Sequence, residues 1–171
     1  MQEPHGFRGF VESRYPSLVR FGTLLCGDLG RGEDLVQESL IKTLRAWARV
    51  GLGEGDPEAY TRKVMTHAAW RASRRKWWGE RPTDQLPEEV DRVGSDAYAR
   101  ADTADAVRAA LATLPDQQRV VLVLRFWAHL TEIEIAHELG CSTGTVKSRA
   151  SRAIAALRAS GLLDETVGGV R

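Results

Sequence analysis

The sequence predicts an all-α protein made of two small helical domains joined by a flexible acidic linker, the second of which contains a helix-turn-helix. Apolar residues recur at helical spacing through most of the chain. The exception is residues 79–104, which carry seven acidic and three basic side chains and no sustained apolar period. Residues 130–157 combine two capped helices with a glycine turn. We therefore expect domains at 5–79 and 104–160, a linker at 80–103 and a tail at 161–171.

The composition is ordinary for a globular protein. The chain has 171 residues, of which 43% are hydrophobic and 27% charged. No apolar run approaches the roughly 20 residues that span a bilayer, and the N-terminus lacks the pattern of a secretory signal. Cys26 and Cys141 lie far apart and do not make a disulfide framework. We expect a cytoplasmic protein without membrane insertion.

The first domain begins with two predicted helices. Residues 7–26 show helical spacing, and Pro16 is expected to bend or restart this helix. The glycine-rich residues 27–32 favour a turn. Residues 33–50 form an amphipathic helix with acidic residues first and basic residues last, as the helix dipole favours. Its inward face consists of Leu35, Val36, Leu40, Leu44 and Trp47.

A third helix is predicted over residues 57–78, with Asp56 as its cap and Pro57 at its first position. Its end is rich in cations and tryptophan, in the series Arg71, Arg74, Arg75, Lys76, Trp77 and Trp78. Adjacent cations and aromatic rings suit melted DNA, because the cations neutralise phosphates while bases stack on the rings. A capped helix end with core tryptophans is the alternative interpretation.

The second domain is predicted to open with two helices. Residues 104–113 are rich in alanine and form a short helix. Residues 115–128 contain the apolar run Val120 to Leu124, which could also be a buried strand. We favour a helix because Pro115 and the polar residues after it make a good helix start, and because the sequence offers no partner strand.

The helix-turn-helix is predicted from its caps. Thr131 and Glu134 make a capping box, Gly140 ends the first helix, and Ser142 caps the second. The inward residues are Ile133, Ile135, Ala136 and Leu139 in the first helix, and Val146, Ala150, Ala153, Ile154 and Leu157 in the second. The outward residues of the second helix are Thr143, Thr145, Lys147, Ser148, Arg149 and Arg152. This polar face is typical of a helix that reads duplex DNA; an ordinary helical hairpin is the alternative.

The sequence predicts no catalytic site, no metal site and no cofactor. His137 and Cys141 are four residues apart, but the helix ends between them, and no second cysteine or histidine completes a zinc set. The chain has no P-loop, no Rossmann glycine pattern and no serine nucleophile elbow. We therefore expect a binding protein rather than an enzyme.

Three blocks of the chain, in order, resemble bacterial RNA polymerase sigma factors of the sigma-70 family. They are Asp34-Leu-Val-Gln-Glu-Ser-Leu-Ile-Lys, Leu114-Pro-Asp-Gln-Gln-Arg, and the helix-turn-helix from Glu134 to Arg149. The resemblance covers roughly residues 7–160 and is to the small extracytoplasmic-function (ECF) type. The Arg-Arg-Lys-Trp-Trp stretch is similar to an actinobacterial, SigE-like subgroup.

The resemblance implies three binding surfaces. The clamp of core RNA polymerase would bind Asp34, Gln37, Glu38 and Lys42. The −10 promoter element would be opened and held by His67, Arg71, Arg74, Arg75, Lys76 and Trp77. The −35 element would be read by Ser142, Thr143, Thr145, Lys147, Ser148, Arg149 and Arg152. The implied partners are core polymerase, through its clamp and flap elements, and promoter DNA; the family also makes an anti-sigma protein plausible.

The sequence departs from the family pattern at three places. His67 stands where many relatives have asparagine, and Gly30 and Gly32 interrupt a stretch that is usually more helical. The outer face of the last helix is less basic than in some relatives, with Ala150 and Ser151 in it.

Two other functions fit parts of the sequence. A conventional helix-turn-helix regulator would bind duplex DNA without polymerase, usually as a dimer. An adaptor that no longer starts transcription could keep the face around Asp34 and lack DNA activity. The acidic linker and the tryptophan-rich basic helix end argue against the regulator.

Overall fold

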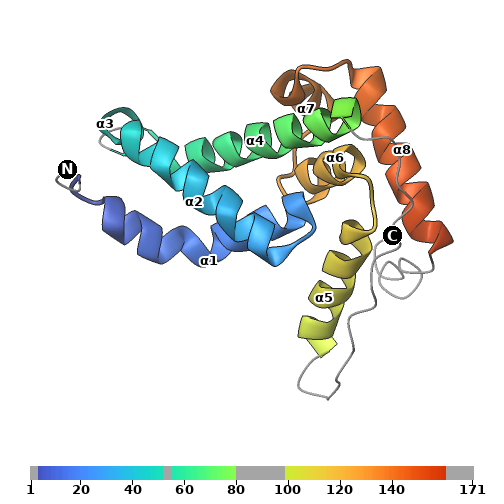
Figure 1. The fold of residues 1–171 in the computed structure, drawn as a ribbon, viewed down its shortest axis with the longest axis horizontal. Coiled ribbons are helices and arrows are strands. Elements are labelled where there is room, and N and C mark those ends of the chain that lie inside the picture. Colours follow the sequence, from blue (N-terminus) through green and yellow to red (C-terminus); the bar gives the residue numbers. More distant parts are fainter. Residues whose placement is uncertain (1–3, 52–54, 80–98, 161–171) are drawn as a thin grey trace.

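The computed structural model describes residues 4–51, 55–79 and 99–160, and all regular structure in these ranges is helical (Figure 1). The all-α fold class is thereby confirmed. The helices are α1 Phe7–Cys26, α2 Leu29–Arg45, α3 Trp47–Val50, α4 Pro57–Gly79, α5 Ala99–Ala112, α6 Asp116–Phe126, α7 Glu132–Leu139 and α8 Thr143–Ala159. None of the described helices has both the length and the apolar character needed to cross a membrane.

The turn between α1 and α2 is shorter than predicted. Gly27 ends α1 with a φ of 71°, and the Asp28 carboxylate caps α2 by accepting the amide hydrogen of Arg31 at 2.8 Å. Gly30 and Gly32, predicted to interrupt the helix, lie inside α2. Gly32 is required by the packing of α2 against α1, because a Cβ atom at this position would lie 2.5 Å from the Thr23 backbone nitrogen. The glycine lets the two helix backbones come close.

The predicted single helix over residues 33–50 is two helices. α2 ends at Arg45, and Ala46 leaves helical geometry with φ −93° and ψ 0° before α3 begins. This break directs the side chain of Trp47 towards the phenylalanines at the start of α1. The Trp47 ring packs edge-on to that of Phe7, with 5.0 Å between the ring centres. The indole nitrogen of Trp47 donates a hydrogen bond to the His5 carbonyl at 3.0 Å. The bend therefore attaches the start of the chain to the first domain.

α1 and α4 are continuous helices that both pack against α2 and against each other. α1 runs through the exposed Pro16 without restarting there. Asp56 caps α4 as predicted, since its carboxylate accepts the amide hydrogens of Glu58 and Ala59 at 2.9 and 3.0 Å. A buried hydroxyl pair, Thr43 to Thr61 at 2.8 Å, joins α2 to α4. The hydroxyl pair fixes the first part of α4 against α2.

α6 is a helix, as predicted, and the strand alternative is wrong. All five residues from Val120 to Leu124 are buried, each no more than 3% exposed. α6 packs against α1 and α4 on one side and against α7 and α8 on the other. Over residues 120–124 this enclosed helix is apolar on every side, which explains why this run shows no single apolar stripe.

The predicted linker is only partly within the described structure. Residues 80–98 and the predicted tail 161–171 lie outside the described residues. Residues 99–103, predicted as irregular linker, instead form the first turns of α5. This segment contains alanine and arginine, which have high helix propensity, so the helix extends further back than the apolar pattern indicated.

The two helical regions share one hydrophobic core. Buried side chains of α1, α2 and α4 form a single cluster with those of α5 to α8, from Leu18 to Leu157. In Figure 1, α6 lies beneath the end of α4, and α7 and α8 wrap the same end. The sequence predicted two helical domains joined by a linker and did not indicate how they sit relative to each other; in the structure they pack directly together.

Replacing Gly32 with alanine should destabilise the protein. The added Cβ would meet the α1 backbone at 2.5 Å, so the two helices must separate, at an expected loss of about 1–3 kcal/mol. Thermal unfolding should show a midpoint lower by several degrees. Gly30→Ala in the same helix is the control, because its Cβ would come no closer than 3.5 Å to another atom. Equal losses for the two variants would contradict the close-approach explanation.

Candidate nucleic-acid and polymerase surfaces

The four residues predicted to bind polymerase lie on one exposed face of α2. Asp34, Gln37, Glu38 and Lys42 follow helical spacing, and each side chain is exposed. None of them forms an ion pair with another described residue, including the Glu38–Lys42 pair that their spacing would allow. Ile41 lies among them with 51% of its surface exposed. Ile41 was not among the predicted residues, although its place outside the inward apolar stripe is a signal that the sequence carries.

The cationic end of α4 presents three free charges. Arg71, Arg74 and Arg75 are exposed, and no described carboxylate forms an ion pair with them. His67 lies one turn earlier, with 39% of its side chain exposed. Lys76 and Trp77 belong to α4, but their side chains lie outside the described part of the structure. The three guanidinium groups are therefore available to bind phosphates.

Trp70 lies on the other side of this helix and was not singled out from the sequence. It is only 7% exposed, and the guanidinium carbon of Arg149 lies 5.0 Å from the centre of its ring. The partner residue is 79 positions away and belongs to the helix-turn-helix. No local sequence signal could have indicated this contact, because it depends on how the two regions pack.

The caps of the helix-turn-helix are confirmed in detail. The Thr131 backbone amide donates to the Glu134 carboxylate at 2.7 Å, and the Glu134 amide donates to the Thr131 hydroxyl at 3.3 Å. Gly140 ends α7 with a φ of 62°. The Ser142 hydroxyl accepts the Thr145 amide hydrogen at 3.1 Å and so begins α8. The cap residues thus determine where the two helices start and stop.

One residue of the predicted apolar side of α7 faces solvent. Ile133 is 73% exposed, whereas Ile135, Ala136 and Leu139 are buried. Ile133 shares its side of the helix with the exposed His137, four residues further on. The predicted inward stripe was therefore one residue too wide.

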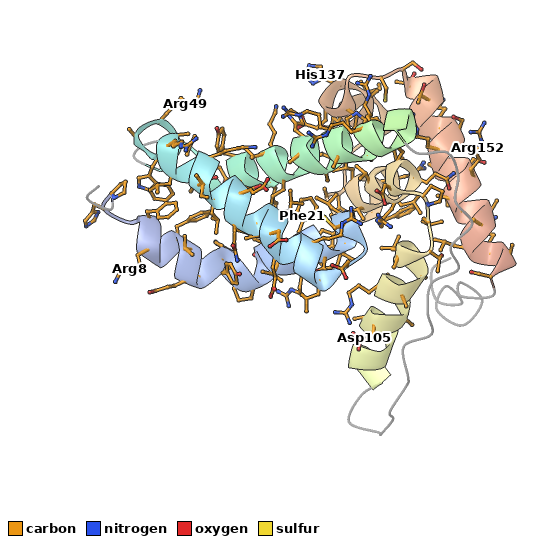
Figure 2. All side chains as sticks on the ribbon, in the orientation of Figure 1. Arg8, Phe21, Arg49, Asp105, His137 and Arg152 are labelled. Atoms are coloured by element: carbon orange, nitrogen blue, oxygen red, sulfur yellow. The ribbon has the colours of Figure 1, made fainter. Side chains whose placement is uncertain are left out.

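Most of the predicted DNA-reading residues of α8 are exposed. Ser142, Thr143, Lys147, Ser148 and Arg152 face solvent, and Figure 2 shows Arg152 on the side of α8 away from α4. Thr145 is half-buried, and its hydroxyl lies 2.9 Å from that of Ser142. This hydroxyl therefore takes part in the helix cap.

Arg149 does not point outward as predicted. It is half-buried and donates a hydrogen bond to the Gln117 side-chain oxygen at 2.6 Å. The reason is its position in α8, three residues after the buried Val146 and four before the buried Ala153. It thus borders the inward stripe, on the side where α4 and α6 approach.

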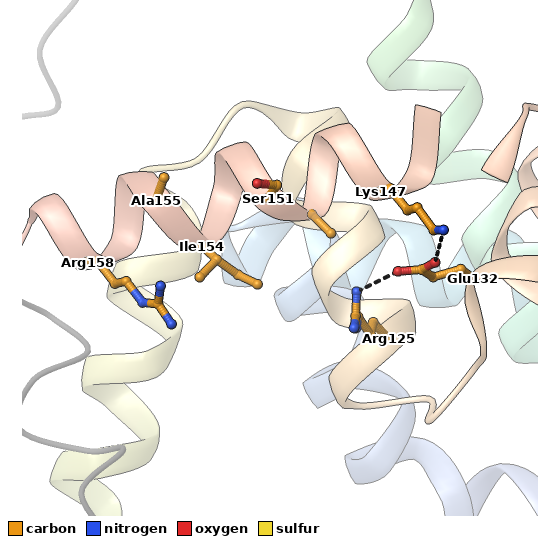
Figure 3. A pocket seen from close by; sticks show the side chains of 8 residues that line it. Arg125, Glu132, Lys147, Ser151, Ile154, Ala155 and Arg158 are labelled. Carbon is orange, nitrogen blue, oxygen red and sulfur yellow. Dashed lines mark hydrogen bonds and ion pairs between the residues drawn. The ribbon is translucent and has the colours of Figure 1, made fainter. Parts of the chain in front are cut away.

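A shallow groove of about 420 Å³ runs between α8 and the adjoining ends of α6 and α7 (Figure 3). Glu132 lies inside it between two cations, 3.1 Å from Arg125 and 3.7 Å from Lys147. Arg158 lines the far end. Glu132 thus pairs with one cation of α6 and one of α8 across this groove.

Removing the Thr131 hydroxyl should change the titration of Glu134. Hydrogen bonds from the Thr131 amide and hydroxyl hold the pKa of the Glu134 carboxyl below its usual value. Such a carboxylate adds stability above its unfolded-state pKa, and this stability is lost as pH falls through the lower folded-state pKa. Thr131→Ala should therefore raise the Glu134 pKa, measured by NMR titration, and cost about 1 kcal/mol at neutral pH. Thr131→Ser keeps the hydroxyl and should change neither quantity; an unchanged pKa in the alanine variant would contradict this account.

Comparison with known proteins identifies the family. Residues 10–79 match the family description "Sigma-70 region 2", and residues 104–157 match "Sigma-70, region 4". The RNA polymerase sigma-E factor of Streptomyces coelicolor is 35% identical over 164 residues, which cover 92% of this chain and 87% of that protein. The ECF RNA polymerase sigma factor SigL of Mycobacterium tuberculosis is 30% identical over 162 residues, covering 88% and 86%.

A solved structure has a similar fold. The sigma factor RpoE of Bartonella quintana, crystallised in complex with the anti-sigma factor NepR, aligns with a TM-score of 0.61 and 25% sequence identity. The alignment covers 92% of this chain and 96% of that chain, so it includes both helical regions. With both sigma-70 regions in order and these relatives matching nearly end to end, the chain belongs to the ECF family of RNA polymerase sigma factors.

Proposed function

We propose that this sigma factor binds core RNA polymerase and directs it to promoters by contacting −35 duplex DNA and the melted −10 strand. The observation that carries the proposal is that one chain contains both family regions and aligns over 92% of its length with a sigma-E factor. We assign residues 5–79 to polymerase binding and −10 recognition, 80–103 to the linker, and 104–160 to −35 recognition. The protein would act in the cytoplasm, where its partners are.

The polymerase clamp would bind the outer face of α2. Asp34, Gln37, Glu38 and Lys42 give this face both signs of charge and amide hydrogen-bonding groups, which suit a specific polar contact. Ile41 provides an apolar centre, and binding energy concentrates where such a side chain becomes buried. A second contact, between region 4 and the flap, would keep both regions on the polymerase.

The melted −10 strand would follow the end of α4. Arg71, Arg74 and Arg75 are free of carboxylate partners among the described residues and would neutralise phosphates. His67 would lie near a captured base, and Lys76 and Trp77 would extend the surface by one further cation and one stacking ring. Arginine and aromatic groups side by side hold single strands without needing a duplex groove.

The −35 duplex would receive α8 in its major groove. Side chains at the start of α8 would reach the base edges, as in other helix-turn-helix proteins. The residues assigned to this surface are Ser142, Thr143, Thr145, Lys147, Ser148, Arg149 and Arg152. Each of the two DNA-binding surfaces, on α4 and on α8, can bind DNA weakly by itself, because polymerase holds both and raises their effective concentration at the promoter.

An anti-sigma protein is a further proposed partner. The matched RpoE was crystallised with the anti-sigma factor NepR, and this chain aligns with RpoE through both regions. A protein that holds both regions at once could keep them from polymerase, because the α2 face must be free to reach the clamp. Binding of such a protein should therefore compete with core polymerase.

Run-off transcription with purified core polymerase tests the function directly. We expect a promoter-specific transcript only when this chain is added. No transcript, together with tight binding of duplex DNA by the isolated chain, would instead favour a conventional helix-turn-helix regulator. Polymerase binding without any transcript would favour the adaptor.

Arg152→Ala should reduce −35-dependent initiation about tenfold while leaving polymerase binding intact, because a good contact to a base is worth roughly 1–3 kcal/mol. Quantitative run-off assays on promoters with and without the −35 element would measure the loss. Arg158→Ala, six residues further along the same helix, is the matched control and should have little effect. Equal losses from the two variants would show that general charge, rather than recognition, supports initiation.

Charge removal at Arg74 and Arg75 should impair promoter opening. Alanine at both positions would remove two exposed cations from α4, so the melted strand would be held less tightly. Permanganate reactivity of unpaired thymines should fall several-fold, while binding of the closed promoter complex changes little. An equal loss of −35 duplex binding would contradict the assignment of these residues to the melted strand.

A further inference from the structure

The groove beside the recognition helix holds one carboxylate that pairs with cations from two other helices (Figure 3). Glu132 is the first residue of α7. Its Oε1 lies 3.1 Å from Arg125 Nη1 of α6, and its Oε2 lies 3.7 Å from Lys147 Nζ of α8. Arg158, at the far end of the groove, pairs with no carboxylate among the residues that the structure describes. The negative charge therefore lies beside Lys147, a residue assigned to −35 DNA.

The two cations are held to different degrees. The Arg125 guanidinium donates a hydrogen bond to Glu132, and its carbon lies 5.6 Å from the centre of the Phe126 ring. The Lys147 ammonium is too far from the carboxylate for a hydrogen bond, and 68% of its side chain is exposed. Arg125 and Glu132 thus form the fixed part of the cluster, and Lys147 is free to donate hydrogen bonds to DNA.

A carboxylate in this position weakens the contact between Lys147 and any phosphate. A phosphate oxygen that Lys147 binds at about 2.8 Å lies no more than about 6.5 Å from the Glu132 carboxylate while Lys147 keeps its place. This separation is within the screening length of about 8 Å at physiological salt, so the two negative groups repel each other. If Lys147 turns towards the phosphate instead, it gives up its ion pair with Glu132.

The edge of a guanine base is affected much less. In the major groove guanine offers O6 and N7, which are uncharged acceptors and a common target of lysine. Glu132 does not repel an uncharged group in this way. The three N–H donors of Lys147 remain free for such acceptors, because none of them is hydrogen-bonded to the carboxylate.

We infer that Glu132 is a specificity-determining residue, which makes Lys147 select the edge of a guanine over a phosphate. The inference rests on the proposed function in one respect, because it takes the outer face of α8 to bind −35 DNA. Glu132 itself belongs to α7 and acts on DNA through the lysine beside it.

The consequence is a higher ratio of promoter affinity to affinity for other DNA. Sequence-independent binding arises almost entirely from phosphate contacts, and Glu132 weakens one of these contacts while leaving the base contact intact. A genome offers a very large number of competing sites, so this ratio decides whether the −35 element is found. The protein thus gains discrimination from a residue that lowers its total affinity for DNA.

Glu132→Gln tests the inference, because glutamine keeps the size of the side chain and an oxygen for Arg125 but removes the charge beside Lys147. Fluorescence anisotropy of the full-length chain would compare two duplexes. One is the sequence that the wild-type chain selects from a random duplex library, and the other is a scrambled version of it. The variant should bind the scrambled duplex about three- to tenfold more tightly, with a salt dependence steeper by about one phosphate contact. The selected duplex should gain less, so that the ratio of the two affinities falls.

Two further variants separate the position of the charge from its amount. Glu134→Gln removes the same charge two residues further along α7, and glutamine there can keep the capping box. This control should leave the affinity ratio unchanged. Lys147→Ala removes the cation on which Glu132 is inferred to act. Adding Glu132→Gln to Lys147→Ala should then change the affinity for the scrambled duplex by less than about twofold, because two residues that act together are not additive.

The inference would be overturned by equal gains for the two duplexes, by equal effects of Glu132→Gln and Glu134→Gln, or by an undiminished effect in the Lys147→Ala background. A lower thermal midpoint with unchanged DNA affinities would assign Glu132 to packing alone, and a library without a preferred sequence would leave it no specificity to support; both results would overturn the inference too. None of these measurements needs polymerase. Wild-type run-off transcription tests the sigma function separately, so the failure of one can be told from the failure of the other.

Discussion

A single buried cation fixes how the two helical regions meet. The guanidinium group of Arg119 forms hydrogen bonds with the carbonyl oxygens of Leu25, Leu114 and Ala112, and pairs with Asp116. A buried charge is tolerated only when it is paired and hydrogen-bonded, and the end of α1 offers carbonyl groups that its own helix leaves free. Gly27 is required beside it, because a Cβ atom there would lie 2.6 Å from Arg119 Nη1.

The position of α6 follows from this anchor, and the rest of the arrangement follows from α6. Once α6 lies against α1, its buried residues from Val120 to Leu124 also pack against α4, α7 and α8. The end of α4 is then next to the helix-turn-helix, which brings Trp70 to Arg149 and His67 to Glu138. A chain that had only a linker between its regions would show none of these contacts.

What the sequence could predict was local, and what it could not predict was set by contacts between distant segments. The caps at Asp56, Thr131 and Ser142 follow from short-range hydrogen bonding and are confirmed. The exposed placement of the α2 residues follows from helical spacing alone. Gly32 and Arg149 were misassigned because the environment of Gly32 comes from α1 and that of Arg149 from α4 and α6, and periodicity carries no information about which helix will be the neighbour.

The contacts of Arg149 and Glu132 explain why the outer face of α8 carries only a modest positive charge. Arg149 faces inward, and Glu132 lies within 3.7 Å of Lys147, so Arg152 is left as the exposed arginine near the middle of the helix. Affinity for DNA depends strongly on how many phosphates a protein neutralises. A face with so little available charge is poorly suited to bind a promoter by itself, yet it suffices for a region that polymerase holds in place. Weak recognition by the isolated chain and strong recognition by the holoenzyme are then two consequences of the same arrangement.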